Sequence, residues 1–116
     1  MTGALAQTTD TVLGGRVVLR QPADGYRVAI DPILLAAACP ALAGETIADL
    51  GCGIGTAALC VAARVPGAQC LGVDIQAPLI ELAIANAQAN GVQDRMRFLR
   101  GDILDTTLPV YATPAD

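Results

Sequence analysis

The sequence lacks two residue types on which many enzymes and nucleic-acid-binding proteins depend. It has no histidine among its 116 residues, which excludes acid–base catalysis by imidazole. It also has no lysine, and its seven basic residues are outnumbered by eleven Asp and Glu, so the net charge is −4. An acidic chain does not hold nucleic acid by bulk electrostatics. Any basic contact surface must therefore be local or lie outside this chain.

The sequence also lacks the signals of metal sites and membrane insertion. No two of its four cysteines form C-x-x-C, so we interpret them as small buried hydrophobic residues: Cys39, Cys52, Cys60 and Cys70. No apolar run reaches about 18 residues, so we predict no membrane contact. The first eleven residues lack the basic head and apolar core of a signal peptide, and we expect a cytoplasmic protein.

A glycine-rich stretch, Asp49–Gly55, organises the rest of the chain. An apolar segment at 46–50 predicts a strand before it, and the run at 56–65 predicts a helix after it. Glycine accepts positive φ and lets a ligand approach the backbone, while the helix start offers free N–H groups. The spacing G-x-G-x-G differs from the dinucleotide pattern because position 56 is Thr. A tight turn without a ligand is the alternative.

The N-terminal part predicts a hairpin and a buried helix. We interpret residues 1–11 as a loose tail, followed by two short strands about the turn Gly14-Gly15. Residues 21–25 have the composition of a turn. Asp31-Pro32 is a favourable helix start, and the helix that ends near Cys39 is apolar on nearly every side.

The rest of the chain alternates between strand and helix patterns. Strands are predicted at 69–73 and 96–99, and a helix from Ala77 to about Asn90-Gly91. In that helix we expect Leu79, Leu82 and Ala83 to face the core, with Asn86, Gln88 and Asn90 outward or at the end. The alternation indicates an α/β fold with a parallel sheet of order 3-2-1, counting strands from 46–50 onward.

Acidic residues lie at the carboxyl ends of the three predicted strands, in Asp49-Leu50-Gly51, Val73-Asp74 and Gly101-Asp102. Because ligands of such sheets lie beyond the carboxyl ends of the strands, Asp49, Asp74 and Asp102 should meet at one edge with the glycine loop. Each also has a structural alternative. In these alternatives, Asp49 organises the glycine loop, Asp74 caps the helix that follows it, or Asp102 forms a turn. As binding groups, Asp74 suits ribose hydroxyls, Asp102 an adenine amino group, and Asp49 a cation. S-adenosylmethionine combines these groups and has no phosphate.

The pattern Asp49-x-Gly51-x-Gly53-x-Gly55, with Asp74 and then Gly101-Asp102-Ile103, resembles class I S-adenosylmethionine-dependent methyltransferases. Gly25-Tyr26-Arg27 and Asp31-x-x-Leu34-Leu35-Ala36-Ala37 are similar to small-domain methyltransferases, most of all the bacterial tRNA(Val) adenine-N6 methyltransferase group. There the Asp–Leu–Leu helix caps the methionine end of the cofactor. The resemblance implies a Rossmann-like fold and cofactor binding by Asp31, Asp49, Gly51, Gly53, Gly55, Asp74, Ile75, Asp102 and Ile103.

The chain departs from this family in one respect. The family's Asn-Pro-Pro-Tyr (or Phe), which holds the target amine after the fourth strand, does not occur here. The resemblance therefore implies an N-terminal part at 1–45 and the cofactor-binding half of a methyltransferase at 46–116, truncated before the fourth strand. This half contains no catalytic residue, and we expect the chain alone to be inactive.

Several expectations about partners follow. The resemblance implies an N-methyltransferase acting on an adenine of tRNA; the alternatives are a non-catalytic S-adenosylmethionine-binding module and a protein-amide N-methyltransferase. Without a fourth strand, the strand at 46–50 becomes an exposed sheet edge through which a homodimer can form. Arg95, Arg97 and Arg100 are either phosphate contacts or a solvated strand face.

Overall fold

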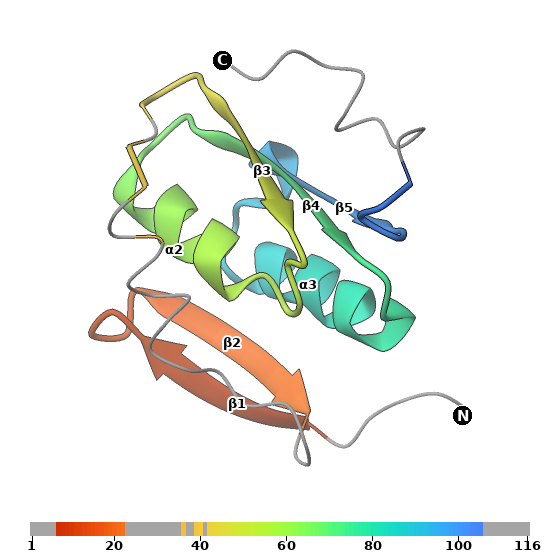
Figure 1. The fold of residues 1–116 in the computed structure, drawn as a ribbon. Coiled ribbons are helices and arrows are strands. Elements are labelled where there is room, and N and C mark those ends of the chain that lie inside the picture. Colours follow the sequence, from red (N-terminus) through yellow and green to blue (C-terminus); the bar gives the residue numbers. More distant parts are fainter. Residues whose placement is uncertain (1–6, 23–35, 37–38, 41, 106–116) are drawn as a thin grey trace.

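The computed structural model describes residues 7–22, 36, 39–40 and 42–105. Its described part has three layers: a parallel sheet, two helices on one face of that sheet, and a hairpin on the far side of the helices (Figure 1). The sheet consists of β3 (Thr46–Leu50), β4 (Gln69–Asp74) and β5 (Met96–Arg100). The helices are α2 (Thr56–Arg64) and α3 (Ala77–Ala89), with a 3-10 turn η1 (Gln93–Arg95) before β5.

The sheet confirms the predicted fold class. Its strands pair in parallel in the order β3-β4-β5, which is the predicted order 3-2-1 read from the other edge. Each predicted strand and helix of this part lies within one residue of its observed bounds, as β4 and β5 each run one residue further and α2 ends one residue earlier. The alternation of strand-like and helix-like apolar patterns along the sequence therefore predicted the sheet and its two helices correctly.

The core lies between the sheet and the helices. Helix α2 is rich in alanine, so it can approach the sheet closely, and Ala58, Leu59 and Val61 are among its buried residues. Helix α3 contributes Leu79, Leu82 and Ala83, as predicted. Cys52, Cys60 and Cys70 are buried free thiols and Cys39 is half-buried, which agrees with their interpretation as packing residues.

The N-terminal hairpin is longer than predicted. The prediction of a loose tail to residue 11 is wrong, since β1 (Gln7–Val12) pairs with β2 (Val17–Pro22) from Gln7↔Pro22 to Val12↔Val17. Gln21 and Pro22, predicted in a turn, end β2; positions 23–25 lie outside the described residues. The predicted Gly14-Gly15 turn is present, with both φ angles positive. Strand β1 is polar, and its partner β2 packs on the helices, so tertiary contact decides this pairing.

The prediction that Asn86 faces outward is wrong. Its side chain is 0% exposed, because β2 covers this side of α3. Its amide hydrogen-bonds to the backbone of Arg20 on β2. An asparagine inside an apolar helix pattern gives no sign, by itself, that a strand edge will meet it.

Three arginines cap carbonyl groups rather than carboxylates. Arg95, expected on a strand face or at phosphate, lies in η1 and donates to the carbonyls of Ala62, Val65 and Ala68 near the end of α2. Arg16 and Arg64 donate to other carbonyls around the same helix end. Cations at a helix C-terminus also complement its partial negative charge. Arg97 and Arg100 are exposed on β5.

Other predictions fall largely outside the described residues. Of the helix predicted at 32–39, Ala36 is helical and buried, whereas Cys39 is not helical. Asp31 and Gly25-Tyr26-Arg27 lie outside the described residues.

Within the part that the structure describes, no helix is long and apolar enough to span a membrane. Nor does that part hold three Cys, Asp or Glu side chains placed to bind a metal ion.

Candidate functional site

Asp74 joins the end of β4 to the glycine loop. Its Oδ2 accepts a hydrogen bond of 3.0 Å from the Gly53 N–H, and its Oδ1 accepts one of 2.9 Å from Gln76 at the start of α3. The residue is buried, at 9% exposure. A carboxylate offers about four lone-pair positions, so these two bonds leave capacity for further donors. The predicted N-cap role is not borne out, because the N-cap of α3 is Gln76 and no side chain caps this helix. Asp74 instead forms a turn at the end of β4, and its remaining acceptor capacity is compatible with ligand binding.

The glycine loop is open on one side and supported on the other. Gly51, Gly53 and Gly55 all have positive φ, at 79°, 56° and 90°, which confirms that the loop needs glycine for its backbone conformation. A Cβ on Gly51 would meet no atom of the described residues within 4 Å. A Cβ on Gly55 would lie 3.3 Å from the ring of Phe98. The loop thus rests on the core through Gly55 and leaves space at Gly51.

Asp49 carries an unpaired buried oxygen. Its Oδ2 is buried and has no hydrogen-bond partner among the residues that the structure describes. Burial raises the pKa of this carboxyl group, and the nearby carboxylate of Asp74 raises it further. A buried acceptor left unpaired is costly, so such an atom is a candidate ligand contact.

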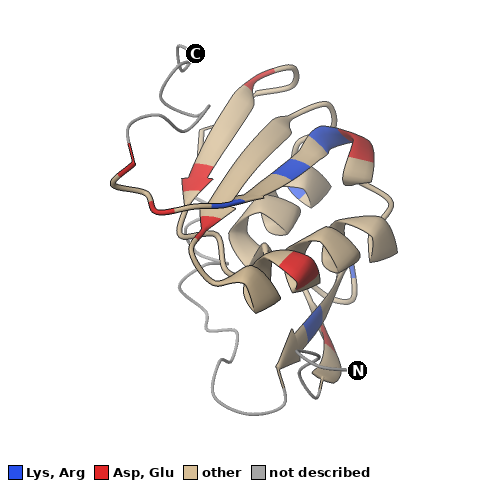
Figure 2. Ribbon diagram, turned by 90° about the vertical axis from the view of Figure 1, so that its right-hand side faces the viewer, with Lys and Arg blue, Asp and Glu red and all other residues tan. Residues whose placement is uncertain are grey.

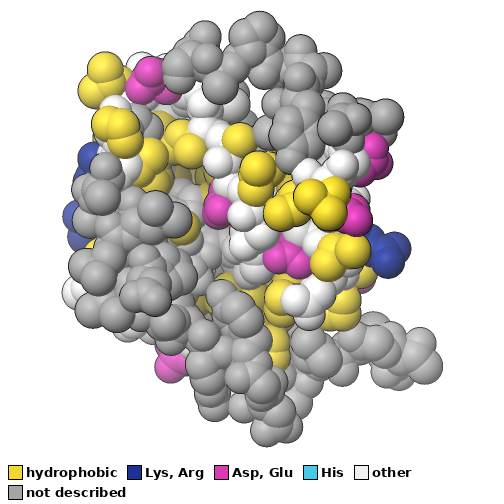
Figure 3. All heavy atoms as spheres, viewed as in Figure 1, with side chains coloured by type: hydrophobic (Ala, Val, Ile, Leu, Met, Phe, Trp, Pro, Cys, Tyr) yellow, Lys and Arg dark blue, Asp and Glu magenta, His cyan; other side chains and the backbone are white. Residues whose placement is uncertain are grey.

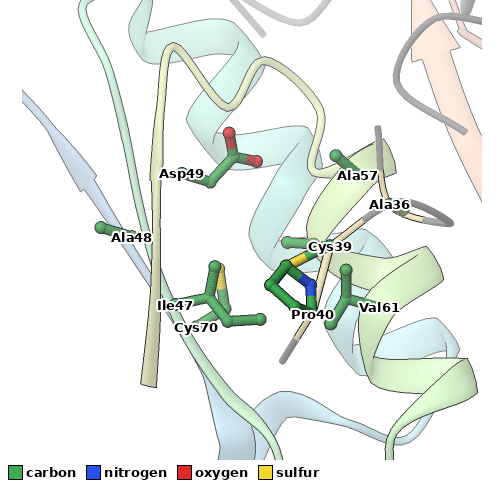
Figure 4. A pocket seen from close by; sticks show the side chains of 10 residues that line it. Ala36, Cys39, Pro40, Ile47, Ala48, Asp49, Ala57, Val61 and Cys70 are labelled. Carbon is green, nitrogen blue, oxygen red and sulfur yellow. The ribbon is translucent and has the colours of Figure 1, made fainter. Parts of the chain in front are cut away.

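Asp49 also lines a cavity of about 320 Å³ between β3 and α2 (Figure 4). Its other described walls are apolar, including Ile47 and Cys70 of the sheet and Val61 of α2. Burial raises the pKa of the Cys70 thiol to about 12, so this thiol is neutral near pH 7. The cavity therefore has one charged group, Asp49, among its described walls.

Apolar side chains are exposed beside these acids. Ile75 is 58% exposed directly after Asp74, and Leu50 and Ile103 are 44% and 40% exposed. Acidic segments lie at the carboxyl ends of the sheet strands (Figure 2), and acidic and apolar side chains gather there on one face (Figure 3). Hydrogen bonds from Gly101 and Arg100 to the carbonyls of Asp74 and Ile75 hold the ends of β4 and β5 together.

Asp102 occupies a turn in this structure. Its carboxylate is exposed and accepts a 2.9 Å hydrogen bond from the Leu104 N–H. The structure therefore brings Asp49, Asp74 and the glycine loop together, with Ile75 beside them. Asp102 and Ile103 follow the neighbouring strand, and no described hydrogen bond joins Asp102 to the other two acids.

Sequence reasoning missed Asn86. Its Nδ2 donates a 3.1 Å hydrogen bond to the carbonyl of Ile54, inside the glycine loop. The only signal was the spacing of Asn86 and Asn90, which lie four residues apart and hence on one face of a helix.

Comparison with known proteins identifies the family. A family model described as a methyltransferase domain matches residues 47–116, which is more than half of the chain. The chain belongs to the methyltransferase-domain family. The predicted resemblance to class I methyltransferases is thus confirmed, and so is the Rossmann-like fold.

Individual methyltransferases are similar over different parts of the chain. A tRNA1(Val) (adenine(37)-N6)-methyltransferase of Porphyromonas gingivalis is 37% identical over 108 residues, covering 86% of this chain and 41% of that protein. A release factor glutamine methyltransferase of Chlorobaculum tepidum is 39% identical over 62 residues, covering 53% of this chain and 21% of that protein. This chain therefore spans less than half the length of both.

A solved structure shows the same arrangement. An RNA methyltransferase from Salinibacter ruber, in complex with S-adenosyl-L-homocysteine, has a TM-score of 0.60 and 26% identity; the match covers 70% of this chain and 52% of that one.

Proposed function

We propose that this methyltransferase domain binds S-adenosylmethionine at the carboxyl ends of β3, β4 and β5 and serves as the cofactor-binding half of an N-methyltransferase acting on an adenine in tRNA. One observation carries the proposal: in the described part of the chain, the buried Oδ2 of Asp49 is unpaired at the start of a glycine loop whose Gly53 N–H is bound by Asp74. Residues 1–45 would form an N-terminal part and 46–116 the cofactor-binding half.

The residues present fit this cofactor. Asp49 offers an unpaired anionic oxygen to a cationic ligand, and the space at Gly51 admits a ligand against the backbone. Asp74 has lone pairs left for ribose hydroxyls. Ile75 and Ile103 expose apolar side chains that suit the faces of an adenine ring, and Asp102 offers an exposed acceptor for its amino group. Asp31 is assigned to the methionine end from the family pattern.

The protein's part in the reaction would be binding and positioning. When bound, the cofactor supplies a methyl group activated by its sulfonium sulfur, which an acceptor amine can take. Asp74, by holding Gly53, fixes the backbone against which the cofactor lies, and preorganised contacts of this kind lower the entropic cost of reaction. We assign no catalytic residue in this chain.

The similarity to the tRNA methyltransferase supports RNA as the acceptor. That match covers 86% of the chain, more than residues 46–116 alone could supply, whereas the match to the glutamine methyltransferase covers 53%. The glutamine methyltransferase nevertheless supports a protein-amide acceptor as the second candidate. A non-catalytic cofactor-binding module is the third.

Calorimetry with S-adenosylhomocysteine on the full chain tests the binding site. We expect Asp74→Ala to weaken binding ten- to hundredfold, because hydrogen bonds to a charged acceptor contribute about 1.5–3 kcal/mol each. Asp94→Ala is the matched control, since it removes the same charge from the exposed turn η1. Equal affinity for Asp74→Ala and the unaltered chain would disprove the ribose assignment.

Incubation with labelled S-adenosylmethionine distinguishes the candidate functions. Offered unmodified tRNA or a glutamine-containing release factor, the 116-residue chain should label neither, because it lacks the tetrapeptide that holds the amine. The same assay on a chain extended with an Asn-Pro-Pro-Tyr-containing second half from the tRNA methyltransferase relative should label tRNA. Labelling of tRNA by the 116-residue chain would show that an amine-holding group exists within it.

A further inference from the structure

Asn86 of α3 and the residue that caps the end of this helix, Asn90, hold the outer edge of β2. The Oδ1 of Asn86 accepts a 2.7 Å hydrogen bond from the Arg20 N–H, and its Nδ2 donates one of 3.0 Å to the Arg20 carbonyl. Asn90 makes the same two hydrogen bonds with Val18: its Oδ1 accepts one of 2.8 Å from the N–H, and its Nδ2 donates one of 2.7 Å to the carbonyl. One helical turn of four residues spans about 6 Å, close to the roughly 6.6 Å between alternate strand residues. Each side-chain amide thus takes the place of a peptide group in a third strand.

The third hydrogen bond of each asparagine differs. Asn90 donates to the carbonyl of Asn86, within its own helix. Asn86 donates instead to the carbonyl of Ile54, at 3.1 Å. Asn86 therefore contacts both the hairpin and the glycine loop, and it does so from a fully buried position.

The Ile54 carbonyl belongs to the peptide group between Ile54 and Gly55. The N–H of that same group donates a 2.9 Å hydrogen bond to the Cys52 carbonyl. Both the C=O and the N–H of this peptide group are therefore hydrogen-bonded. The glycines on either side of Ile54, Gly53 and Gly55, have positive φ angles of 56° and 90°. Glycine has little intrinsic preference between these and negative angles, so outside contacts must hold the loop in one conformation.

We propose that Asn86 is a positioning residue of the cofactor site, through which the N-terminal hairpin maintains the conformation of the glycine loop. This inference rests on the proposed function, because the loop is the predicted binding surface for S-adenosylmethionine. Asn86 touches no cofactor. It acts through the Ile54–Gly55 peptide group.

The two asparagines form a matched pair for the test. Asn86→Ala and Asn90→Ala each remove three hydrogen bonds, two of them to β2, and both should lower the melting temperature. Only Asn86→Ala should weaken S-adenosylhomocysteine binding, by about tenfold, at a temperature where both variants are folded. It alone should also speed amide hydrogen exchange at Gly53 and Gly55 in the free protein. Equal effects of the two substitutions on affinity and on loop exchange would overturn the inference.

The unaltered protein provides a second test, which does not depend on the folding of a variant. Coupling between two sites is reciprocal, so cofactor binding must in turn stabilise the hairpin contact. Saturating S-adenosylhomocysteine should slow amide exchange at Arg20, which bonds to Asn86, more than at Val18, which bonds to Asn90. Equal changes at the two amides would contradict the inference. Absence of any binding by the unaltered chain would instead refute the proposed function, and the loop exchange of the two free variants would still test the role of Asn86.

Discussion

Gly72 of β4 lies directly beneath the ring of Phe98 of β5. The two residues are partners in the parallel register, and a Cβ added to Gly72 would lie 2.6 Å from Cδ1 and 2.9 Å from Cε1 of that ring. The same ring lies close to Gly55 in the glycine loop. The absence of a side chain at Gly72 thus lets Phe98 reach across the sheet and support the predicted cofactor site from below.

Gly72→Ala should therefore destabilise the protein by about 1–3 kcal/mol, the usual cost of overpacking a close-packed core. Urea unfolding measures this loss. Phe98→Leu in the same chain should recover part of it, because the smaller side chain frees the space above position 72. If the double variant were no more stable than the sum of the two single effects predicts, the contact between Gly72 and Phe98 would not be the cause.

Asp49→Asn should stabilise the free protein at neutral pH. The raised pKa of Asp49 means that the folded state binds protons more tightly than the unfolded state, so stability falls as pH rises above about 4, the ordinary carboxyl value. The substitution removes this penalty, and its advantage should shrink as the pH is lowered toward 4. Chemical unfolding between pH 7 and pH 4.5 measures the trend.

The same substitution should weaken S-adenosylhomocysteine binding, because an amide cannot supply the anionic oxygen. Asp102→Asn, at an exposed carboxylate, is the control for stability and should change it little. A loss of stability in Asp49→Asn at pH 7 would mean that the buried carboxylate has a partner in the folded protein.

The edge of the sheet predicts self-association. In the described part of the chain β3 pairs on one side only, with β4, and its residues Thr46, Ala48 and Leu50 are exposed. It has no lysine or proline, which are residues that prevent strand addition at an edge. We expect a dimer or larger assembly through β3, through the segment Asp31–Cys39, or through both.

Light scattering at high micromolar concentration tests this association. Ala48→Lys should shift the protein toward monomer, whereas Thr9→Lys on the exposed strand β1 should leave the assembly unchanged. A monomer without either substitution would count against the prediction.

The sequence by itself determined the parallel sheet, its order and the glycine loop. Each of these depends on local properties: apolar periods of two kinds, a run of glycines at a strand-to-helix turn, and an acid at the carboxyl end of each strand. The apolar pattern of each of these elements is contained in a stretch of about ten residues. Prediction from the sequence was therefore possible for helices α2 and α3 and for strands β3, β4 and β5. The family pattern in Asp49–Gly55 and Asp74 has the same local character.

Only the tertiary structure decided how the hairpin packs on the helices that cover this sheet. The polar strand β1 has no core-facing pattern of its own, and its pairing depends on β2 lying against α3. Asn86 looked like a solvent-facing residue because its partners, Arg20 and Ile54, lie 66 and 32 residues away in the chain. Likewise, Asp49 acquires its unpaired oxygen and raised pKa only when folding buries it beside Asp74. Burial and hydrogen bonding across such separations are properties of the packed chain, so local sequence patterns do not contain them.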